Sequence, residues 1–308
     1  MTSVRRRRWR AALTGYAFLS PNILGFLAFT ALPVAASLAL SFYAYDNLTP
    51  ARFVGLDNYA RLLGWHADAA GHWIANDARF WRCLGNTLFL MLGLPATMAG
   101  ALAVALALNR RLPATLALRT IYYLPTISPV IAVALVWMWI FNADYGLLNV
   151  ALARLGARGP NWLGDPAWAK PALMIIGFWA NVGGFTMLLY LAGLQGIPAA
   201  YYEAAAMDGA GAWQRFRHIT WPLLGPVNFF VVVMGVIAGF QAFGLPYVML
   251  AGGPAGATTT VAYYIFNNAF AFSKMGYASA IAWVLFFLVF GLTLAQWRAR
   301  KRFLFEYD

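Results

Sequence analysis

The chain has 308 residues, of which 62% are hydrophobic and only 10% are charged. Soluble globular proteins carry about 25% charged residues, so this composition excludes a pair of soluble domains and predicts a protein with several membrane spans. The formal net charge of +12 is carried by the segments that flank the apolar runs. It reflects membrane topology and contact with anionic membrane lipid, and no nucleic-acid recognition motif accompanies it. The single cysteine, Cys83, excludes an internal disulfide and a cysteine-based metal site.

Six runs without any charged residue divide the chain, and each is long enough for the roughly 20 residues that a spanning helix needs. We therefore predict an all-α, polytopic membrane protein with six transmembrane helices in a single domain, residues 1–308. The predicted spans are residues 16–43, 84–108, 121–141, 172–194, 223–250 and 277–296. The first apolar run is too long for a cleaved signal peptide, so we keep it as a span.

The distribution of basic residues predicts how these spans are oriented. If both termini are cytoplasmic, the cytoplasmic segments hold most of the 22 lysines and arginines, as the positive-inside rule requires. These segments are the N-terminal arginine run, the loops after the second and fourth spans, and the C-terminal tail. We therefore expect a multi-pass protein of the cell membrane with both termini in the cytoplasm.

The loops on the other side carry aromatic and turn-forming residues. They include FVGLDNYARLL at residues 53–63, FNADYGLLN at 141–149 and NWLGDP at 161–166. The last of them, MLAGGPAGATTT at residues 249–260, contains a Gly-Gly-Pro sequence that demands a turn.

The loop after the fourth span, residues 196–222, carries two acids and two arginines between neighbours without charge, so it must lie in water. Pro198 can open a helix there, and Gly209 and Gly211 can take the left-handed conformation that ends one. A second short helical piece would follow this corner, and Pro222 would break the pattern before the next span. The sequence predicts an exposed, rigid elbow. The alternative, an amphipathic loop on lipid headgroups, has no need of the glycine corner.

The run E-A-A-x-x-D-G-A in this loop, followed by Phe216, Ile219 and Pro222, resembles the EAA signature of permease subunits of binding-protein-dependent ABC importers. The outer loops and the Gly-Gly-Pro sequence are similar to the sugar-type branch of that family, which includes maltose and glycerol-3-phosphate permeases. The resemblance implies a MetI-like five-helix core, made by spans two to six, plus an N-terminal helix, in the inner membrane. Trp221 departs from the smaller aliphatic residue that the family usually has.

In that family the elbow is a coupling helix that docks in a cleft of a separate ATPase subunit. The resemblance assigns the ATPase-docking role to Glu203, Ala204, Ala205, Asp208, Gly209 and Ala210. It also implies four kinds of partner: a second permease subunit, two nucleotide-binding ATPase subunits, an extracytoplasmic solute-binding protein and the solute itself.

ATP hydrolysis by this chain is excluded by its lysines. A phosphate-binding loop needs G-x-x-x-x-G-K-[ST], whereas Lys170, Lys274 and Lys301 are followed by proline, methionine and arginine. We therefore predict a transport subunit that is not an enzyme and holds no cofactor, with ATP and magnesium used by the partner ATPase.

Two interrupted stretches within the spans are candidates for the solute path: FWANVGGF in span four and GFQAFGLP in span five. The predicted path residues are Asn181, Phe185, Gln241 and Phe243. Amides exchange hydrogen bonds with hydroxyl groups and aromatic rings cover the apolar face of a sugar. These residues could equally serve only to pack helices together. The family often has an acid where Gly244 stands.

The predicted function is import of a sugar or related polyol, with glycerol 3-phosphate as the alternative solute. A self-contained secondary carrier is the alternative from another class. Proton coupling would require ionisable residues within the spans, and the predicted spans contain no Asp, Glu, Lys or Arg. Sodium coupling through backbone carbonyls stays open, because such ligands leave little trace in a sequence. A membrane enzyme would need a convergent set of reactive side chains, which the spans lack.

Overall fold

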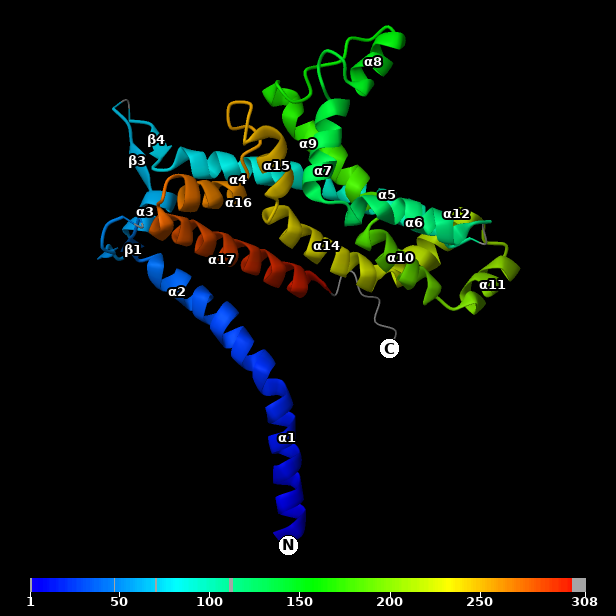
Figure 1. Ribbon diagram of the computed structural model, residues 1–308. Helices are drawn as coiled ribbons and strands as arrows, with labels where there is room; N and C mark the ends of the chain where they lie inside the picture. The colour runs from blue at the N-terminus through cyan, green and yellow to red at the C-terminus, as the bar shows by residue number, and fades with distance from the viewer. Residues whose placement is uncertain (1, 47, 70, 111–112, 301–308) are drawn as a thin grey trace. The chain divides into compact units, whose positions relative to one another are not determined.

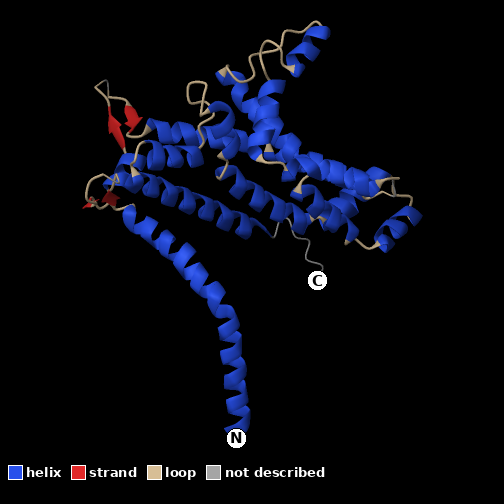
Figure 2. Cartoon of the chain, in the orientation of Figure 1, coloured by secondary structure: helices blue, strands red, loops and turns tan. Residues whose placement is uncertain are grey.

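The computed structural model describes residues 2–46, 48–69, 71–110 and 113–300 (Figure 1). This part of the chain is mainly helical, but it also contains four short strands, so the predicted all-α class holds only for the greater part of the protein (Figure 2). The chain forms two compact units, residues 1–76 with 265–284 and residues 77–264 with 285–308. The predicted C-terminal tail beyond residue 300 lies outside the described residues.

The first unit combines long helices with two small antiparallel hairpins. Its elements are α1 (Thr2–Phe26), the π-helix η1 (Leu27–Ala31), α2 (Leu32–Leu40), β1 (Tyr43–Ala44), β2 (Arg52–Phe53), α3 (Asp57–Leu63), β3 (Trp65–Ala67), β4 (Trp73–Ala75), the π-helix η3 (Asn267–Ala271) and the start of α17 (Met275–Ala299). Strand β1 pairs with β2 and β3 with β4.

A proline accounts for the π-helical turn in the first apolar run. Pro33 has no N–H to offer the carbonyl of Phe29, so the hydrogen-bond ladder widens over Leu27–Ala31 before α2 continues. The end of α2 is fixed by α3, because the side-chain amide of Asn58 donates to the carbonyl of Ser41 at 2.8 Å. The predicted 53–63 segment therefore serves, within this unit, to anchor a helix end.

The second unit holds the helices that carry the candidate sites. They are α4 (Ala78–Met91), α5 (Leu94–Leu108), α6 (Thr115–Ile127), α7 (Val130–Ile140), α8 (Leu147–Arg154), α9 (Pro166–Val182), α10 (Phe185–Gln195), α11 (Ala199–Met207), α12 (Ala212–Arg215), the π-helix η2 (Phe216–Thr220), α13 (Trp221–Leu223), α14 (Gly225–Phe240), α15 (Gly244–Leu250) and most of α16 (Val261–Phe266).

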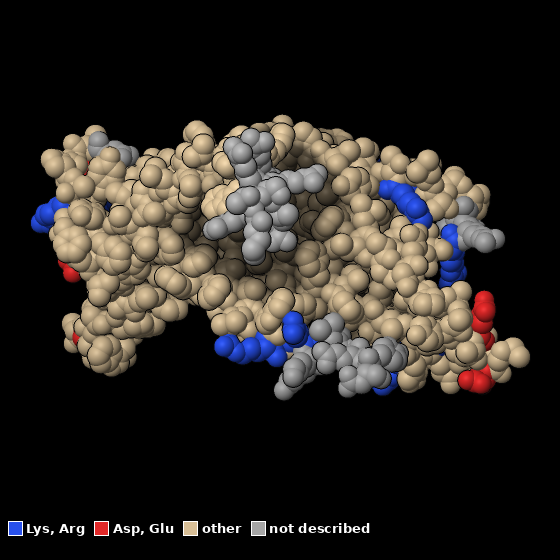
Figure 3. Space-filling view, turned by 90° about the horizontal axis from the view of Figure 1, so that it is seen from below, with Lys and Arg blue, Asp and Glu red and all other residues tan. Residues whose placement is uncertain are grey.

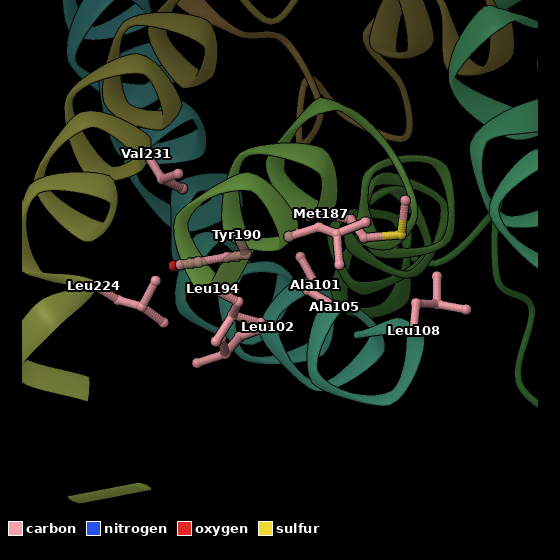
Figure 4. Close-up of a cluster of buried hydrophobic side chains, with 10 residues drawn as sticks. Ala101, Leu102, Ala105, Leu108, Met187, Tyr190, Leu194, Leu224 and Val231 are labelled. Carbon is pink, nitrogen blue, oxygen red and sulfur yellow. The ribbon is translucent and has the colours of Figure 1, made fainter. Parts of the chain in front are cut away.

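Helices α5, α10 and α14 meet in the core cluster, a group of buried apolar side chains (Figure 4). Its members include Ala101, Leu102, Ala105, Leu108, Met187, Tyr190, Leu194, Leu224 and Val231. Alanine on α5 lets the backbone of α10 approach closely, a packing typical of helices in membranes. A second buried cluster forms around Phe141, Trp162 and Ile176.

Four helical stretches in the described chain are long and apolar enough to cross a membrane, namely Leu13–Leu40, Ala78–Leu108, Gly225–Leu250 and Met275–Ala299. Two bent helix pairs would raise the number to six if each pair is one span. The predicted third span is not one straight helix, because α6 and α7 meet at 95°. The cause is Pro129, which forces the preceding Ser128 into an extended conformation at ψ 137°.

The predicted fourth span is also broken, with a bend of 41° between α9 and α10. Gly183 and Gly184 lie at this break. A Cβ at Gly183 would overlap the backbone of Tyr122, and one at Gly184 would meet the hydroxyl of Thr126. Only glycine therefore allows α6 to pass this close to the break.

Candidate functional site

The elbow, residues 196–222, begins with the predicted helix. Pro198 has an extended ψ of 134° and α11 starts directly after it. The helix ends at Met207, and Gly209 follows with a left-handed φ of +76°. The N–H of Ala210 then donates to the carbonyl of Ala205 at 2.8 Å, which satisfies a carbonyl at the helix end. The predicted short helix and the glycine corner at Gly209 are confirmed.

Two details of the predicted elbow are wrong. Gly211 is extended, at φ −71° and ψ 170°, and its N–H caps α12 by donating to Oε1 of Gln214 at 2.7 Å. Pro222 does not interrupt the second helical piece but lies inside α13. The missing N–H of Pro222 is accommodated because the preceding turn, η2, is a π-helix, as is the turn η1 before Pro33.

The exposed face of the elbow combines carboxylates with apolar side chains. Glu203 and Asp208 are exposed, and Met207 and Trp213 expose 90% and 68% of their surface. Figure 3 shows acidic side chains gathered at its right-hand end, where α11 lies in Figure 1. Large apolar side chains next to charges in a water-exposed segment are typical of a protein-binding surface.

The predicted docking residues share this segment but differ in exposure. Glu203, Ala204, Asp208 and Gly209 are exposed, whereas Ala205 and Ala210 are partly buried at the corner.

The base of the elbow is attached to the core cluster. The ring of Phe216 packs against this cluster, and the ring of Trp213 stacks on Phe216 at 5.5 Å between centroids. Leu224, two residues after the elbow, is fully buried within the cluster. A displacement of the elbow therefore acts on packed helices and not on a flexible loop.

The second candidate site is a cavity of about 590 Å³ within the second unit. Its lining comes from α4, α5, α7, α9, α10 and α14, from Gly93 and from residues 242–246. The predicted path residues Asn181, Phe185 and Phe243 are part of this lining. Gln241 is not, and its side chain is exposed. The structure thus brings three of the four predicted path residues to one cavity.

Asn181 and Phe243 are held in different ways. The side-chain amide of Asn181 donates to the carbonyl of Gly177 at 2.8 Å, which orients its exposed side chain. The ring of Phe243 stacks on Tyr247 with centroids 5.0 Å apart and meets Tyr263 edge-on. Asn181 can therefore accept a hydrogen bond from a ligand hydroxyl through its carbonyl oxygen, while Phe243 offers a fixed aromatic wall.

Part of the cavity could not be found from the sequence. Leu90 and Met91 of α4 and Leu94 and Thr97 of α5 line it, and no motif distinguishes them from other apolar residues. Gly235 lets α14 approach this part of the lining, because a Cβ at Gly235 would lie 2.5 Å from Leu94.

Lys170, which the sequence placed just before a span, also lies near this region. It belongs to α9, and its Nζ is 3.3 Å from Oδ1 of Asn86 and 4.7 Å from the ring centroid of Phe89. Lys170 is not itself among the residues that line the cavity. Among the described residues, no group of three or more His, Cys, Asp or Glu could hold a metal ion.

Comparison with known proteins identifies the family. Residues 97–301 match the model of the binding-protein-dependent transport system inner membrane component. The chain is 39% identical to the probable ABC transporter permease protein YesP of Bacillus subtilis over 92% of this chain and 88% of that protein. It is 36% identical to the trehalose/maltose transport system permease protein MalF of Thermococcus litoralis, over 93% of each.

A solved bacterial ABC transporter involved in import of the acidic polysaccharide alginate has the same fold. Its similar chain has a TM-score of 0.79 and 24% identity, covering 96% of this chain and 99% of that one. The resemblance suggested by the elbow is thereby confirmed. The chain belongs to the family of binding-protein-dependent transport system inner membrane components, and it is a multi-pass membrane protein.

Proposed function

We propose that this chain is the permease subunit of an ATP-driven importer and forms the path for a sugar or related polyol. One observation carries the proposal: the same two helices serve both candidate sites. Helix α10 contributes Phe185 to the cavity and leads into the elbow, and α14 leaves the elbow and contributes Gly239 to the cavity. A force on the elbow would therefore reach the cavity walls directly.

The elbow is the proposed docking surface for the ATPase subunits. In this arrangement both termini and the elbow lie in the cytoplasm, as the positive-inside bias indicates. ATP binding closes the two ATPase subunits, and the elbows of two permease subunits follow them. Docking can shift the chain between inward-facing and outward-facing states only if its free energy differs between those states.

The cavity is the proposed solute path, and its lining favours an uncharged solute. Its volume of about 590 Å³ lies within the range of about 300–1,000 Å³ typical of ligand pockets. The described lining contains amide and hydroxyl groups, such as Asn181 and Thr97, but no charged side chain. The relative MalF is named for trehalose and maltose. A neutral sugar fits this chemistry better than glycerol 3-phosphate, whose phosphate would favour a cation.

Reconstitution tests the proposal. Proteoliposomes that contain this chain, a second permease subunit and the ATPase subunits, supplied with sugar-loaded binding protein, should take up sugar only when ATP is present. Liposomes with this chain alone should show no uptake under a proton or sodium gradient. Ion-driven uptake by the chain alone would show a self-contained carrier and overturn the proposal.

A further inference from the structure

A hydrogen bond joins the two arms of the elbow. The hydroxyl of Tyr202, on α11, lies 2.9 Å from Oγ1 of Thr220, the last residue of η2. Thr220 is only 4% exposed and Tyr202 is half-buried. In the described chain, this is the one side-chain hydrogen bond that connects α11 to the part of the elbow after the corner.

The position of this bond relates it to both ends of the elbow. Tyr202 directly precedes Glu203, the exposed acid of the docking surface. Thr220 lies one turn before Leu224, which is fully buried in the core cluster at the start of α14. The bond therefore runs from the arm that carries the docking acid to the buried base of a helix that lines the cavity.

The two arms of the elbow, α11 and the part from α12 to η2, are also joined covalently by the backbone of the corner at residues 208–211. Gly209 is in the left-handed region and nothing lies within 4 Å of the site a Cβ would occupy, so no neighbouring group packs over this side of Gly209. Backbone bonds across the corner, such as Ala210 to Ala205, fix the end of α11 but do not reach η2. The hydrogen bond between Tyr202 and Thr220 is a second attachment, outside the corner, and it makes the two arms move together.

We propose that Tyr202 and Thr220 form a brace, a pair of positioning residues that makes the elbow turn as one piece with α14. This inference rests on the proposed docking function. The brace transmits displacement and makes no contact with the partner ATPase. Loss of the tyrosine hydroxyl should therefore leave the ATPase bound and weaken the response of the cavity to ATP.

The reporter for this response is a cysteine placed at Ala238, an exposed residue of α14 that lines the cavity. The native Cys83 is buried, so labelling by N-ethylmaleimide reports mainly on the new thiol. In the assembled complex, the labelling rate is measured without nucleotide and with ATP plus vanadate. The difference between the two rates measures how much the accessibility of the cavity changes with the nucleotide state of the ATPase. The measurement does not require the solute to be known.

Tyr202→Phe removes one hydroxyl and keeps the ring. We expect the ATPase subunits to copurify as before and the vanadate-induced change in labelling to shrink by about two- to tenfold, the range for loss of one hydrogen bond. Tyr201→Phe is the matched control, since it removes the same group from a neighbouring exposed ring and should leave the change unaltered. Thr220→Val should act like Tyr202→Phe, and Thr220→Ser should retain the response.

The double variant Tyr202→Phe/Thr220→Val completes a thermodynamic cycle. If the two hydroxyls act as a pair, the double variant loses no more of the response than either single variant. Additive losses, or an unchanged response in Tyr202→Phe with the ATPase bound, would overturn the brace. Glu203→Lys distinguishes the proposed docking function from the brace. If this variant fails to weaken ATPase binding, the docking function is wrong, whatever the brace variants show.

Discussion

The elbow and the cavity are built in opposite ways. The elbow is one continuous segment, and its corner is closed by bonds between near neighbours, such as Ala210 to Ala205 and Gly211 to Gln214. The cavity gathers residues from Leu90 to Pro246, which meet only through the packing of several helices. The first therefore depends on local backbone chemistry and the second on long-range contacts.

This difference assigns them different mechanical properties. A segment whose shape is set by its own caps can keep that shape while it moves, as the proposed docking segment must. A cavity lined by several helices changes its shape whenever those helices shift, as the proposed solute path must. Variants that act on backbone geometry should therefore affect the elbow most, and variants that act on free volume should affect the cavity most.

The largest effect is expected for Gly209→Pro. Proline fixes φ near about −65°, which is incompatible with +76° at Gly209, and it removes the N–H that donates to Ala206. Membrane insertion and abundance should be retained, because the elbow lies outside the predicted spans. Solute-stimulated ATP hydrolysis of the assembled complex should fall to the rate measured without solute.

Gly209→Asn is the matched control for this change. Asparagine visits the left-handed region more readily than other side chains, and nothing surrounds the position of its Cβ. It should retain most of the stimulation. Equal stimulation in the proline and asparagine variants would show that the corner geometry does not matter for coupling.

The same contrast explains what the sequence could predict. The corner at Gly209 follows from residues within one turn of it, so a single sequence is sufficient. Gly211 was assigned the wrong conformation because a nearby glutamine, Gln214, caps the next helix and selects an extended backbone. The bend at Ser128 was missed although Pro129 signals it, because an apolar run of suitable length favoured one straight span.

The cavity was predictable only where amides or helix-breaking residues interrupt apolar runs. Asn181 lies two residues before Gly183 and Phe243 lies directly before Gly244, and this pattern led to the cavity. Met91 and Leu94 are ordinary apolar residues, and their place in the lining depends on which face of α4 and α5 the other helices cover. Such facing is a tertiary property, which one sequence without relatives does not reveal.

The second largest effect is expected from filling the cavity at Gly177. This residue lines the cavity, and nothing lies within 4 Å of the position that a Cβ would take. Gly177→Leu should therefore place its side chain in open space and block uptake without disturbing the packing of α9. The complex should still assemble and hydrolyse ATP without solute, so uptake and hydrolysis should separate.

Gly85→Leu provides the control for added bulk. Gly85 is exposed on α4, also has open space at its Cβ position, and does not line the cavity. Its uptake should match that of the parent. A similar loss in both variants would attribute the effect at Gly177 to helix disturbance and not to the cavity.

The smallest effects are expected from the two amides, and they test how far the solute path extends. Asn181→Ala removes an oriented amide from the cavity wall and should lower uptake by about two- to tenfold, the range for one lost hydrogen bond.

Gln241→Ala should also weaken uptake, but less, because Gln241 is exposed and lies outside the described lining. ATPase assembly, measured by copurification, should be unchanged in both. If Gln241→Ala has the larger effect, the path runs along the break between α14 and α15. If neither changes uptake kinetics, both amides only hold helices together, and the cavity recognises its solute through other groups.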